Sequence, residues 1–343
     1  MKYGLMYYKS TDNIGDDIQT YAAIKYLPHI DYYIDRENLS CFVPDKKEYV
    51  SMIMNGWFIH NKLAWPPSPY INPLLISMHF KDLKETDVGD MYLKGIGGEF
   101  LKKYGPVGAR DYETIKRLEN NNIDAYFSGC LTLTLEKFCK IKKKEKICLV
   151  DVSNEVILKV KENTSLEIET ITHSLNQRET EKKNINERMN DVENILKRYQ
   201  ESSIVITSRL HCALPCLALG TTVIVLHKEV FDEDRLGSFF RLFTNYIEED
   251  FLKMDIKKVL DKPNKNNKDY LKFKKLLKMR CKNFIKGCKK CDFNKDKLPD
   301  IEEYKKYVNR LSWYKEIYEK ERLIVEKIER KRVEEYNLYH KNL

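Results

Sequence analysis

The feature that most constrains the fold is a strand–helix–strand unit in the second half of the chain. Residues 204–207 and 222–226 are short runs of β-branched and apolar side chains, and the segment between them is helical in pattern up to Gly220. A connection of this length joins two parallel strands, whereas a hairpin needs only a short turn. The first residues repeat the arrangement, because the apolar run 2–8 is followed by a loop with one glycine and then by a helical pattern from residue 18. The chain therefore predicts an alternating α/β fold with parallel sheets.

The length of the chain favours two such units. One hydrophobic core rarely grows beyond roughly 250–300 residues, and this chain has 343. A lysine-rich break at 142–146 separates two stretches of alternating strand and helix patterns. We expect an N-terminal Rossmann-like domain at 1–140, a second Rossmann-like domain at 147–262 and a basic helical tail at 263–343. Most of this tail is expected to be one long C-terminal helix.

Positive charge is concentrated near the end of the chain. The formal net charge is +9, yet residues 251–343 hold 28 Lys and Arg against 15 Asp and Glu, so the rest of the chain is slightly acidic. Such a stretch attracts phosphate-rich surfaces, although a solvated helix face is the common alternative. No nucleic-acid-binding motif of recognised spacing is present. We therefore expect no nucleic acid partner and consider peripheral contact of the tail with a membrane.

Composition also bears on the compartment. No run reaches the ~18 apolar residues of a membrane-spanning helix, and the first residues lack the apolar core of a secretion signal. The nine cysteines, an odd number, fit reduced thiols better than a disulfide framework. We expect a cytoplasmic protein, with any membrane contact at the inner surface.

Three of the cysteines, Cys281, Cys288 and Cys291, lie close together in the sequence. A structural zinc site takes four ligands, and no second C-x-x-C or neighbouring histidine completes this set. We expect reduced thiols in a lysine-rich helical region and no bound metal.

The segment richest in chemistry is Ser208-Arg209-Leu210-His211, between a strand pattern and a helix pattern. Ligands of open α/β sheets bind at this edge, and helix N-termini attract anions. Arg209 offers a bidentate fork for a phosphate or carboxylate, and His211 titrates near neutral pH. A surface Arg–Asp pair and a helix-capping histidine are the alternative interpretation.

Two more loops occupy similar positions. Arg110 follows a short strand pattern and either contacts a ligand or pairs with a local carboxylate. Asn13 begins an early loop in which Gly15 permits close backbone approach. Asp16 or Asp17 of that loop could contact sugar hydroxyls or act as a base.

Two histidines at strand ends, His79 and His173, are open to two interpretations. Each is either a functional group or a partly buried side chain with its hydrogen bonds satisfied.

Taken together, these segments resemble the polysaccharide pyruvyl transferase family. The resemblance spans roughly residues 1–245, and the Ser-Arg-Leu-His block is its most specific part. The matching motifs follow the family's order and are Asn13-x-Gly15-Asp16, Gly108-Ala109-Arg110-Asp111, Ser128-Gly129, Ile206-Thr207-Ser208-Arg209-Leu210-His211 and Ala218-Leu219-Gly220-Thr221. The resemblance implies two Rossmann-type domains facing a cleft, the GT-B-like arrangement of many glycosyltransferases. The C-terminal helical extension lies outside it.

The resemblance also implies an activity, the transfer of a pyruvyl group from phosphoenolpyruvate to two hydroxyls of a sugar as a cyclic ketal. By position, Arg110, Arg209 and His211 would line the donor site, with Ser208 and Leu210 beside them. The loop from Asn13 through Gly15, Asp16 and Asp17 would contact the acceptor, a sugar of a polysaccharide or a lipid-linked glycan precursor. Cys130 stands where the family often has an aspartate, so the role of that loop is open.

The residue types suit this chemistry. Phosphoenolpyruvate carries a phosphate and a carboxylate, and each charge-assisted bond from an arginine contributes ~1.5–3 kcal/mol. A protonated His211 would deliver a proton to the methylene carbon. No step requires a metal or a cofactor, since phosphoenolpyruvate is a co-substrate. The alternative is a nucleotide-sugar glycosyltransferase of the same architecture, in which Glu229, Asp232, Glu233 and Asp234 would hold a ribose.

Overall fold

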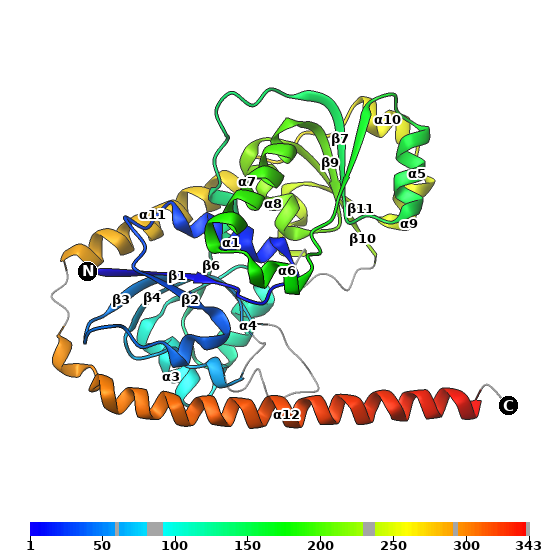
Figure 1. Ribbon diagram of the computed structural model, residues 1–343. Coiled ribbons are helices and arrows are strands. Elements are labelled where there is room, and N and C mark those ends of the chain that lie inside the picture. Colours follow the sequence, from blue (N-terminus) through cyan, green and yellow to red (C-terminus); the bar gives the residue numbers. More distant parts are fainter. Residues whose placement is uncertain (59–61, 81–91, 229–236, 291–293, 341–343) are drawn as a thin grey trace.

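The computed structural model describes residues 1–58, 62–80, 92–228, 237–290 and 294–340. The chain has an α/β fold with two parallel sheets, as the sequence predicts (Figure 1). The acidic residues between 229 and 236, considered above for ribose binding, lie outside the described residues.

The first sheet has six strands in the order β2-β1-β3-β4-β5-β6, and all of its neighbouring strands are parallel. Its strands are β1 (Lys2–Tyr7), β2 (Tyr32–Asp35), β3 (Val50–Trp57), β4 (Ile71–His79), β5 (Val107–Ala109) and β6 (Ala125–Phe127). The helices associated with these strands in sequence are α1 (Ile14–Ile24), α3 (Gly95–Tyr104) and α4 (Tyr112–Asn120), with short 3₁₀ turns η1 (Arg36–Cys41), η2 (Lys62–Ala64) and η3 (Leu131–Thr134).

The second sheet has five parallel strands in the order β11-β10-β9-β7-β8. They are β7 (Lys144–Val150), β8 (Glu167–Ile171), β9 (Ser202–Thr207), β10 (Thr222–His227) and β11 (Thr244–Ile247). The helices of this part are α5 (Asn154–Glu162), α6 (Gln177–Lys182), α7 (Ile185–Glu201), α8 (Leu210–Leu219), α9 (Glu248–Lys253) and α10 (Ile256–Asp261), with the 3₁₀ turn η5 (Gly237–Leu242).

Strand β7 begins inside the lysine-rich break that the sequence analysis placed between the two units. Lys144 pairs with Ser202 of β9, and its ammonium contacts Glu201 at 2.7 Å. Lys146 is buried and contacts Glu169 at 2.7 Å. Glutamates on neighbouring elements thus allow lysines to occupy the start of a strand, and the break is shorter than its composition indicates.

Helices α7 and α8 fold as their sequences dictate. Asn184 and Glu187 form a capping box at the start of α7, which satisfies backbone N–H groups that a helix leaves unpaired. Every residue of α8 is buried, and the helix ends at Gly220, whose φ of 72° lies in the left-handed region. An apolar helix of this kind must sit inside a core.

One core lies between the two sheets. It includes Ile18 and Ala22 of α1, Leu196 of α7 and Leu214 and Leu217 of α8, all buried. These three helices contact one another, so packed side chains join the two sheets in addition to the covalent connection between them.

The chain then returns to the first sheet through α11 (Tyr270–Lys290), which contacts β3, β4 and η3 (Figure 1). Its apolar side is buried, and Leu277 and Cys281 belong to the core between the sheets. Ile285 and Cys288 pack with Tyr3. Much of the stretch described above as a basic tail therefore completes the core, while Cys291 lies outside the described residues.

The last helix, α12 (Ile301–His340), starts against the first sheet and then runs past the rest of the molecule (Figure 1). Tyr304 donates a hydrogen bond to the Ser40 carbonyl at 2.8 Å, and Lys315 donates one to the Glu37 carbonyl at 3.2 Å. Of the helices that the structure describes, none has both the length and the apolar character needed to cross a membrane.

Candidate functional site

Both sheets share a topological feature at which ligands commonly bind. In each one, the first and third strands in sequence are neighbours, β1 beside β3 and β7 beside β9, and the order of winding reverses there. Ligands of open α/β sheets bind outside the carboxyl ends of the strands at this point. The side chains at these two edges are therefore the candidates for function.

The early glycine loop begins α1 and touches the second unit. The Asn13 side chain accepts a hydrogen bond from the Gly15 N–H at 2.9 Å and caps the helix. A Cβ atom on Gly15 would lie 3.0 Å from both Cβ and Nδ1 of His211. Ile14 donates its backbone N–H to the His173 carbonyl at 3.0 Å. Gly15 thus permits the close approach of two protein segments.

The two aspartates of this loop have different environments. Asp17 is buried and accepts two hydrogen bonds from Arg188 of α7, at 2.5 and 3.1 Å, so it fastens α1 to α7. Asp16 is half-buried and accepts hydrogen bonds from the Thr11 hydroxyl at 2.9 Å and the Gln19 amide at 3.2 Å. Of the two, Asp16 is the carboxylate held at the edge of the sheet.

Arg110 and His211 meet across the two units. Arg110 follows β5 and is 1% exposed, and its Nη1 lies 3.4 Å from Nε2 of His211, in the first turn of α8. A guanidinium has no acceptor, so Nε2 accepts and carries no hydrogen in this arrangement. The same Nη1 donates to Gln19 at 3.0 Å. The other two guanidinium nitrogens, Nε and Nη2, are buried without a hydrogen-bond partner.

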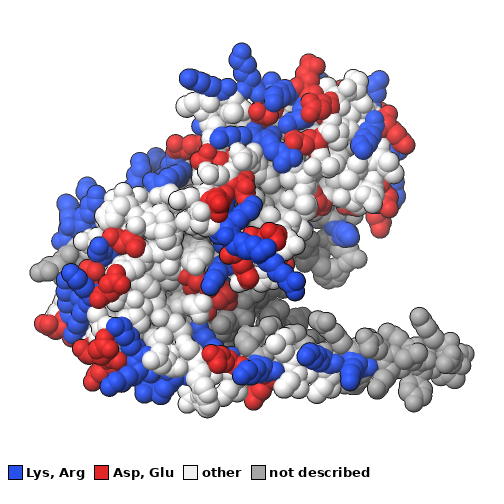
Figure 2. Space-filling model, in the orientation of Figure 1, with Lys and Arg blue, Asp and Glu red and all other residues white. Residues whose placement is uncertain are grey.

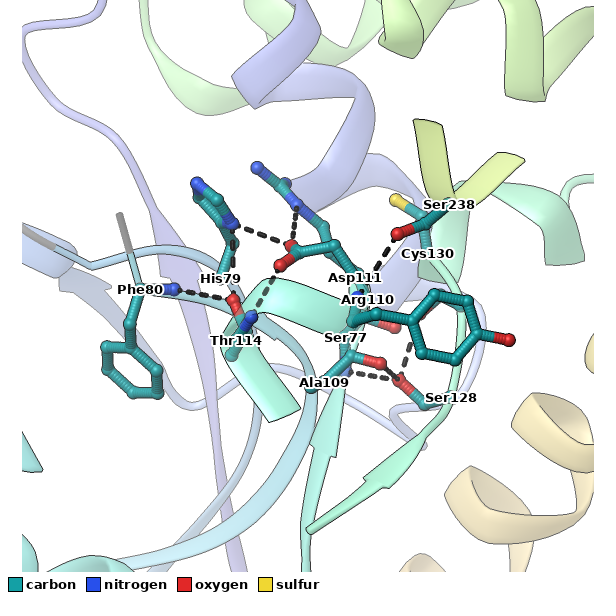
Figure 3. Close-up of polar contacts among 12 residues, drawn as sticks. Ser77, His79, Phe80, Ala109, Arg110, Asp111, Thr114, Ser128, Cys130 and Ser238 are labelled. Carbon is teal, nitrogen blue, oxygen red and sulfur yellow. Dashed lines mark hydrogen bonds and ion pairs between the residues drawn. The ribbon is translucent and has the colours of Figure 1, made fainter. Parts of the chain in front are cut away.

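A buried carboxylate stands next to this pair. Asp111 Oδ2 lies 2.6 Å from Nδ1 of His79 and 3.9 Å from Nε of Arg110, and Figure 3 shows both side chains linked to it. Asp111 also caps α4 by accepting the Thr114 N–H at 2.8 Å. Burial opposes its charge, but the hydrogen bond from His79 and the charges of His79 and Arg110 outweigh this and lower the pKa of Asp111. Asp111 is thus a buried carboxylate held between His79, Arg110 and the start of α4.

Arg209 occupies a different place from Arg110. It is the N-cap residue of α8, its side chain is 41% exposed, and its Nε lies 2.7 Å from Asp151 Oδ2. It lines a cavity of about 370 Å³ at the carboxyl edge of the second sheet. The other polar side chains of this cavity belong to Asp151, Ser153, Ser208, His227, Lys228 and Glu248. Arg110 and His211 are not among the residues that line this cavity.

The remaining residues of the predicted donor site have structural contacts, either hydrogen bonds to backbone groups or packing in the core. The Ser208 hydroxyl donates to the Asp151 carbonyl at 2.5 Å, and Leu210 is a core side chain. The Ser128 hydroxyl accepts the Ser77 N–H at 3.1 Å and donates to the Ala109 carbonyl at 3.0 Å (Figure 3). Cys130, beside it, is buried in the core.

His173 is a core histidine with its hydrogen bonds made. Its Nε2 lies 2.5 Å from the Tyr199 hydroxyl, and its backbone N–H donates to Asp151 at 3.0 Å. Burial lowers the pKa of His173 to about 4. This side chain is therefore neutral at pH 7 and supports the Asp151 loop.

Sequence reasoning missed Gln19 and Arg36. Gln19 bridges Asp16 and Arg110 through its amide, and its position three residues after Asp16 on the same helix was the available signal. Arg36, after β2, lies over the Tyr8 ring at 4.3 Å, and its neighbour Glu37 accepts from its Nε. An Arg-Glu dipeptide looks like solvated surface, so no sequence signal marked it.

Among the described residues, no three His, Cys, Asp or Glu side chains gather in a way that could hold a metal ion.

Residues 90–226 match the family model of the polysaccharide pyruvyl transferases. The matched stretch contains Arg110 and the segment 208–211, and it confirms the resemblance there. The loop at 13–17 lies outside it. No curated protein matches the chain.

Two solved structures show a weaker likeness. A functionally uncharacterised protein from Klebsiella pneumoniae is 15% identical, with 68% of this chain and 88% of that chain covered and a TM-score of 0.41. The UDP-GlcNAc 2-epimerase of Methanocaldococcus jannaschii, solved with UDP-GlcNAc and UDP, is 10% identical, with 84% and 99% covered and a TM-score of 0.47. At these values neither structure carries a functional conclusion.

Proposed function

We propose that this protein is a pyruvyltransferase that moves the pyruvyl group of phosphoenolpyruvate onto a sugar of a polysaccharide or a lipid-linked glycan precursor. The observation that carries the proposal is the Arg110–His211 contact, because it places a buried guanidinium with two unpartnered nitrogens beside an imidazole. Buried polar groups are normally hydrogen-bonded, so these two N–H groups are donors that an anionic substrate group could use. The family match, which contains both residues, supports this interpretation and does not favour a nucleotide-sugar glycosyltransferase.

The proposed architecture is a pair of Rossmann-like domains in a GT-B-like arrangement. Its support is that both sheets are parallel and share one strand order. The contact between Arg110 at the end of β5 and His211 at the start of α8 brings their carboxyl edges together.

The donor would bind around the N-terminus of α8. Arg110 would take one anionic group with its spare N–H groups, and Arg209 would exchange Asp151 for another anionic group at the cavity side. The N-terminal N–H groups of α8 add positive potential at the same point. Two guanidinium groups approaching from two sides suit a small molecule with a phosphate and a carboxylate.

His211 would be the general acid. Its Nε2 lies beside the Arg110 guanidinium, and an anion that neutralises this guanidinium would favour a proton on the imidazole. That proton passes to the methylene carbon of phosphoenolpyruvate, and the two sugar oxygens form C–O bonds at the central carbon as the bond to phosphate breaks. Of the two hydroxyl protons, one replaces the proton given by the acid and the other leaves on phosphate.

Asp16 would contact the acceptor hydroxyls. Its orientation is fixed by Thr11 and Gln19, and Gln19 links it to Arg110. Asn13 and Gly15 would serve by shaping the loop. Asp17 would act through its pairing with Arg188 and not by contact with a sugar.

The test is phosphate release from phosphoenolpyruvate over a panel of sugar acceptors. Arg110→Met should abolish most of the release and weaken phosphoenolpyruvate binding in calorimetry, while the matched exposed variant Arg178→Met should do neither. Release that occurs without any acceptor, or donor affinity that is unchanged in Arg110→Met, would contradict the proposal.

We also propose peripheral contact of α11 with an anionic membrane at the cytoplasmic side. This helix has eight lysines, one arginine and no acidic residue, and Figure 2 shows basic side chains along the edge that carries it. Each lysine near such a surface contributes ~1 kcal/mol. Because the apolar side of α11 is core, the test is charge reversal of the exposed Lys272, Lys275, Lys282 and Lys286 to Glu, followed by sedimentation with phosphatidylglycerol vesicles. Undiminished sedimentation would exclude α11, and neutral vesicles are the control.

A further inference from the structure

A second buried guanidinium lies at the carboxyl edge of the first sheet, directly after β2. Arg36 follows β2, its side chain is 9% exposed, and its Nη1 is buried without a hydrogen-bond partner. Its Nε is taken by Glu37, and its guanidinium lies 4.3 Å above the ring of Tyr8, the residue that follows β1. Leaving a charged donor buried and unpaired costs free energy, so a group that accepts from it is expected.

Tyr8 links Arg36 to the cluster around Arg110. Its hydroxyl donates to the Asn55 carbonyl of β3 at 3.0 Å, so it reaches from β1 to β3, where the winding reverses. The Asn55 side-chain amide donates to the Gln19 carbonyl at 3.1 Å, and the Gln19 side chain accepts from Arg110 at 3.0 Å. Burial raises the pKa of the Tyr8 phenol, and the charges of Arg36 and Arg110 both act against that rise. The two arginines are thus joined through Tyr8, Asn55 and Gln19.

Asp16, the carboxylate proposed to contact the acceptor, lies on the same chain of contacts. It accepts a hydrogen bond from the Gln19 amide at 3.2 Å, and Gln19 is joined to Tyr8, and so to Arg36, through Asn55. A carboxylate and a guanidinium linked in this way match a ligand that offers hydroxyls and a negative charge together.

We infer that Arg36 binds an anionic group of the acceptor, so that the preferred substrate is a sugar bearing a carboxylate or a phosphate. This inference rests on the proposed function. A carboxylate and a phosphate both present an oxyanion, which would lie a short distance from the reacting hydroxyls. Comparing an acceptor that carries a carboxylate with one that carries a phosphate distinguishes these two groups.

The first test uses the unmodified full chain and three acceptors of one sugar type, namely glucose, glucuronate and glucose 1-phosphate. With saturating phosphoenolpyruvate, kcat/KM for at least one anionic acceptor should exceed that for glucose by about tenfold to a hundredfold, the range of one charge-assisted pair. Equal values for all three sugars would overturn the inference and leave the pyruvyltransferase proposal standing.

The second test compares Arg36→Met and Arg36→Lys with the exposed control Arg178→Met, after thermal denaturation has verified folding. Arg36→Met should remove the preference by raising KM for the anionic acceptor, and Arg36→Lys should retain part of it because the charge remains. A merely structural role would lower kcat for all acceptors alike and keep the preference, which would overturn the inference.

Binding separates this inference from the proposed function if no sugar reacts. Inorganic phosphate is titrated calorimetrically into the wild type, Arg36→Met and Arg110→Met. A phosphate site lost in Arg36→Met and retained in Arg110→Met supports the anion site at Arg36. Identical binding by the wild type and Arg36→Met would overturn it.

Discussion

At the carboxyl edge of the first sheet Arg110 is 1% exposed and keeps two nitrogens without hydrogen-bond partners, whereas at the second sheet Arg209 is 41% exposed and paired with Asp151. A buried guanidinium with spare donors is held in place by the protein and costs free energy until an anion arrives. An exposed, paired guanidinium can change partners at little cost, because water screens both states. The first edge is thus organised for tight, specific contact, and the second for exchange. A transferase that must bind one substrate firmly and release phosphate has use for both.

The largest expected effect is at His211, whose contact with Arg110 joins the carboxyl edges of the two sheets. His211→Ala should lower kcat by about 10²–10⁴, the usual contribution of a positioned general acid. The measurement is phosphate release at saturating phosphoenolpyruvate, with a melting curve to verify folding. His29→Ala, an exposed histidine paired with Asp31, is the control and should leave kcat unchanged. Near-normal turnover in His211→Ala would show that the contact between the edges is structural.

Acid should lower the free energy of unfolding through His173, which supports the Asp151 loop at the carboxyl edge of the second sheet. Its pKa is about 4 in the folded protein and near 6.5 when unfolded, so the unfolded state binds the proton more readily between these values. The linked stability is fully present above pH 6.5 and decreases by about 3 kcal/mol as the pH falls to 4.

The measurement is urea unfolding across this pH range, in the wild type and in His173→Gln. The variant should lose this part of the pH slope. Parallel slopes in the two proteins would mean that His173 is not held neutral in the fold.

The two arginines should respond unequally to the same conservative change. Arg110→Lys should raise KM for phosphoenolpyruvate about a hundredfold, because a buried ammonium cannot replace the fork. Arg209→Lys should raise it about tenfold, since its exposed contact is screened. Steady-state kinetics at low and high salt measure both, and salt should weaken the Arg209 contribution more. Equal losses with equal salt dependence would remove the distinction between the edges.

The smallest expected effect concerns two serines that each directly follow a strand, Ser128 after β6 and Ser208 after β9. Ser128→Ala should destabilise the protein by about 1–2 kcal/mol, because the buried Ser77 N–H loses its acceptor. Ser208→Ala should cost about 0.5 kcal/mol or less, since Ser208 lines an open cavity where water can replace the hydroxyl. Denaturant melts of both variants give the values. A reversed order would mean that the second edge is the more rigid one.

The periodic patterns predicted the fold better than the composition did. The strand–helix–strand unit around Ser208 forms as its apolar runs predict, because such runs are a local property of the sequence. The lysine-rich composition of residues 142–146 and of α11 is typical of solvated segments. In the structure, however, Lys146 is buried beside Glu169 and α11 buries one apolar side. Such partners are distant in sequence, so composition cannot show them.

The sequence likewise predicts only part of the candidate site. Arg110, His211 and the Gly15 loop lie together because their strand ends meet, which strand order makes predictable. The exposed pairing of Arg209 with Asp151, and the buried pairing of Asp17 with Arg188, depend on side-chain direction and on contacts between elements distant in sequence. Nothing local in the sequence distinguishes Asp16 from Asp17.

The return of α11 to the first sheet sets an order for assembly during synthesis. Tyr3 leaves the ribosome nearly three hundred residues before its packing partners Ile285 and Cys288. Until α11 has been made, the strand that contains Tyr3 has an uncovered apolar surface, of the kind that chaperones bind and that aggregates in their absence. The first sheet therefore becomes fully packed only after the second sheet has been translated.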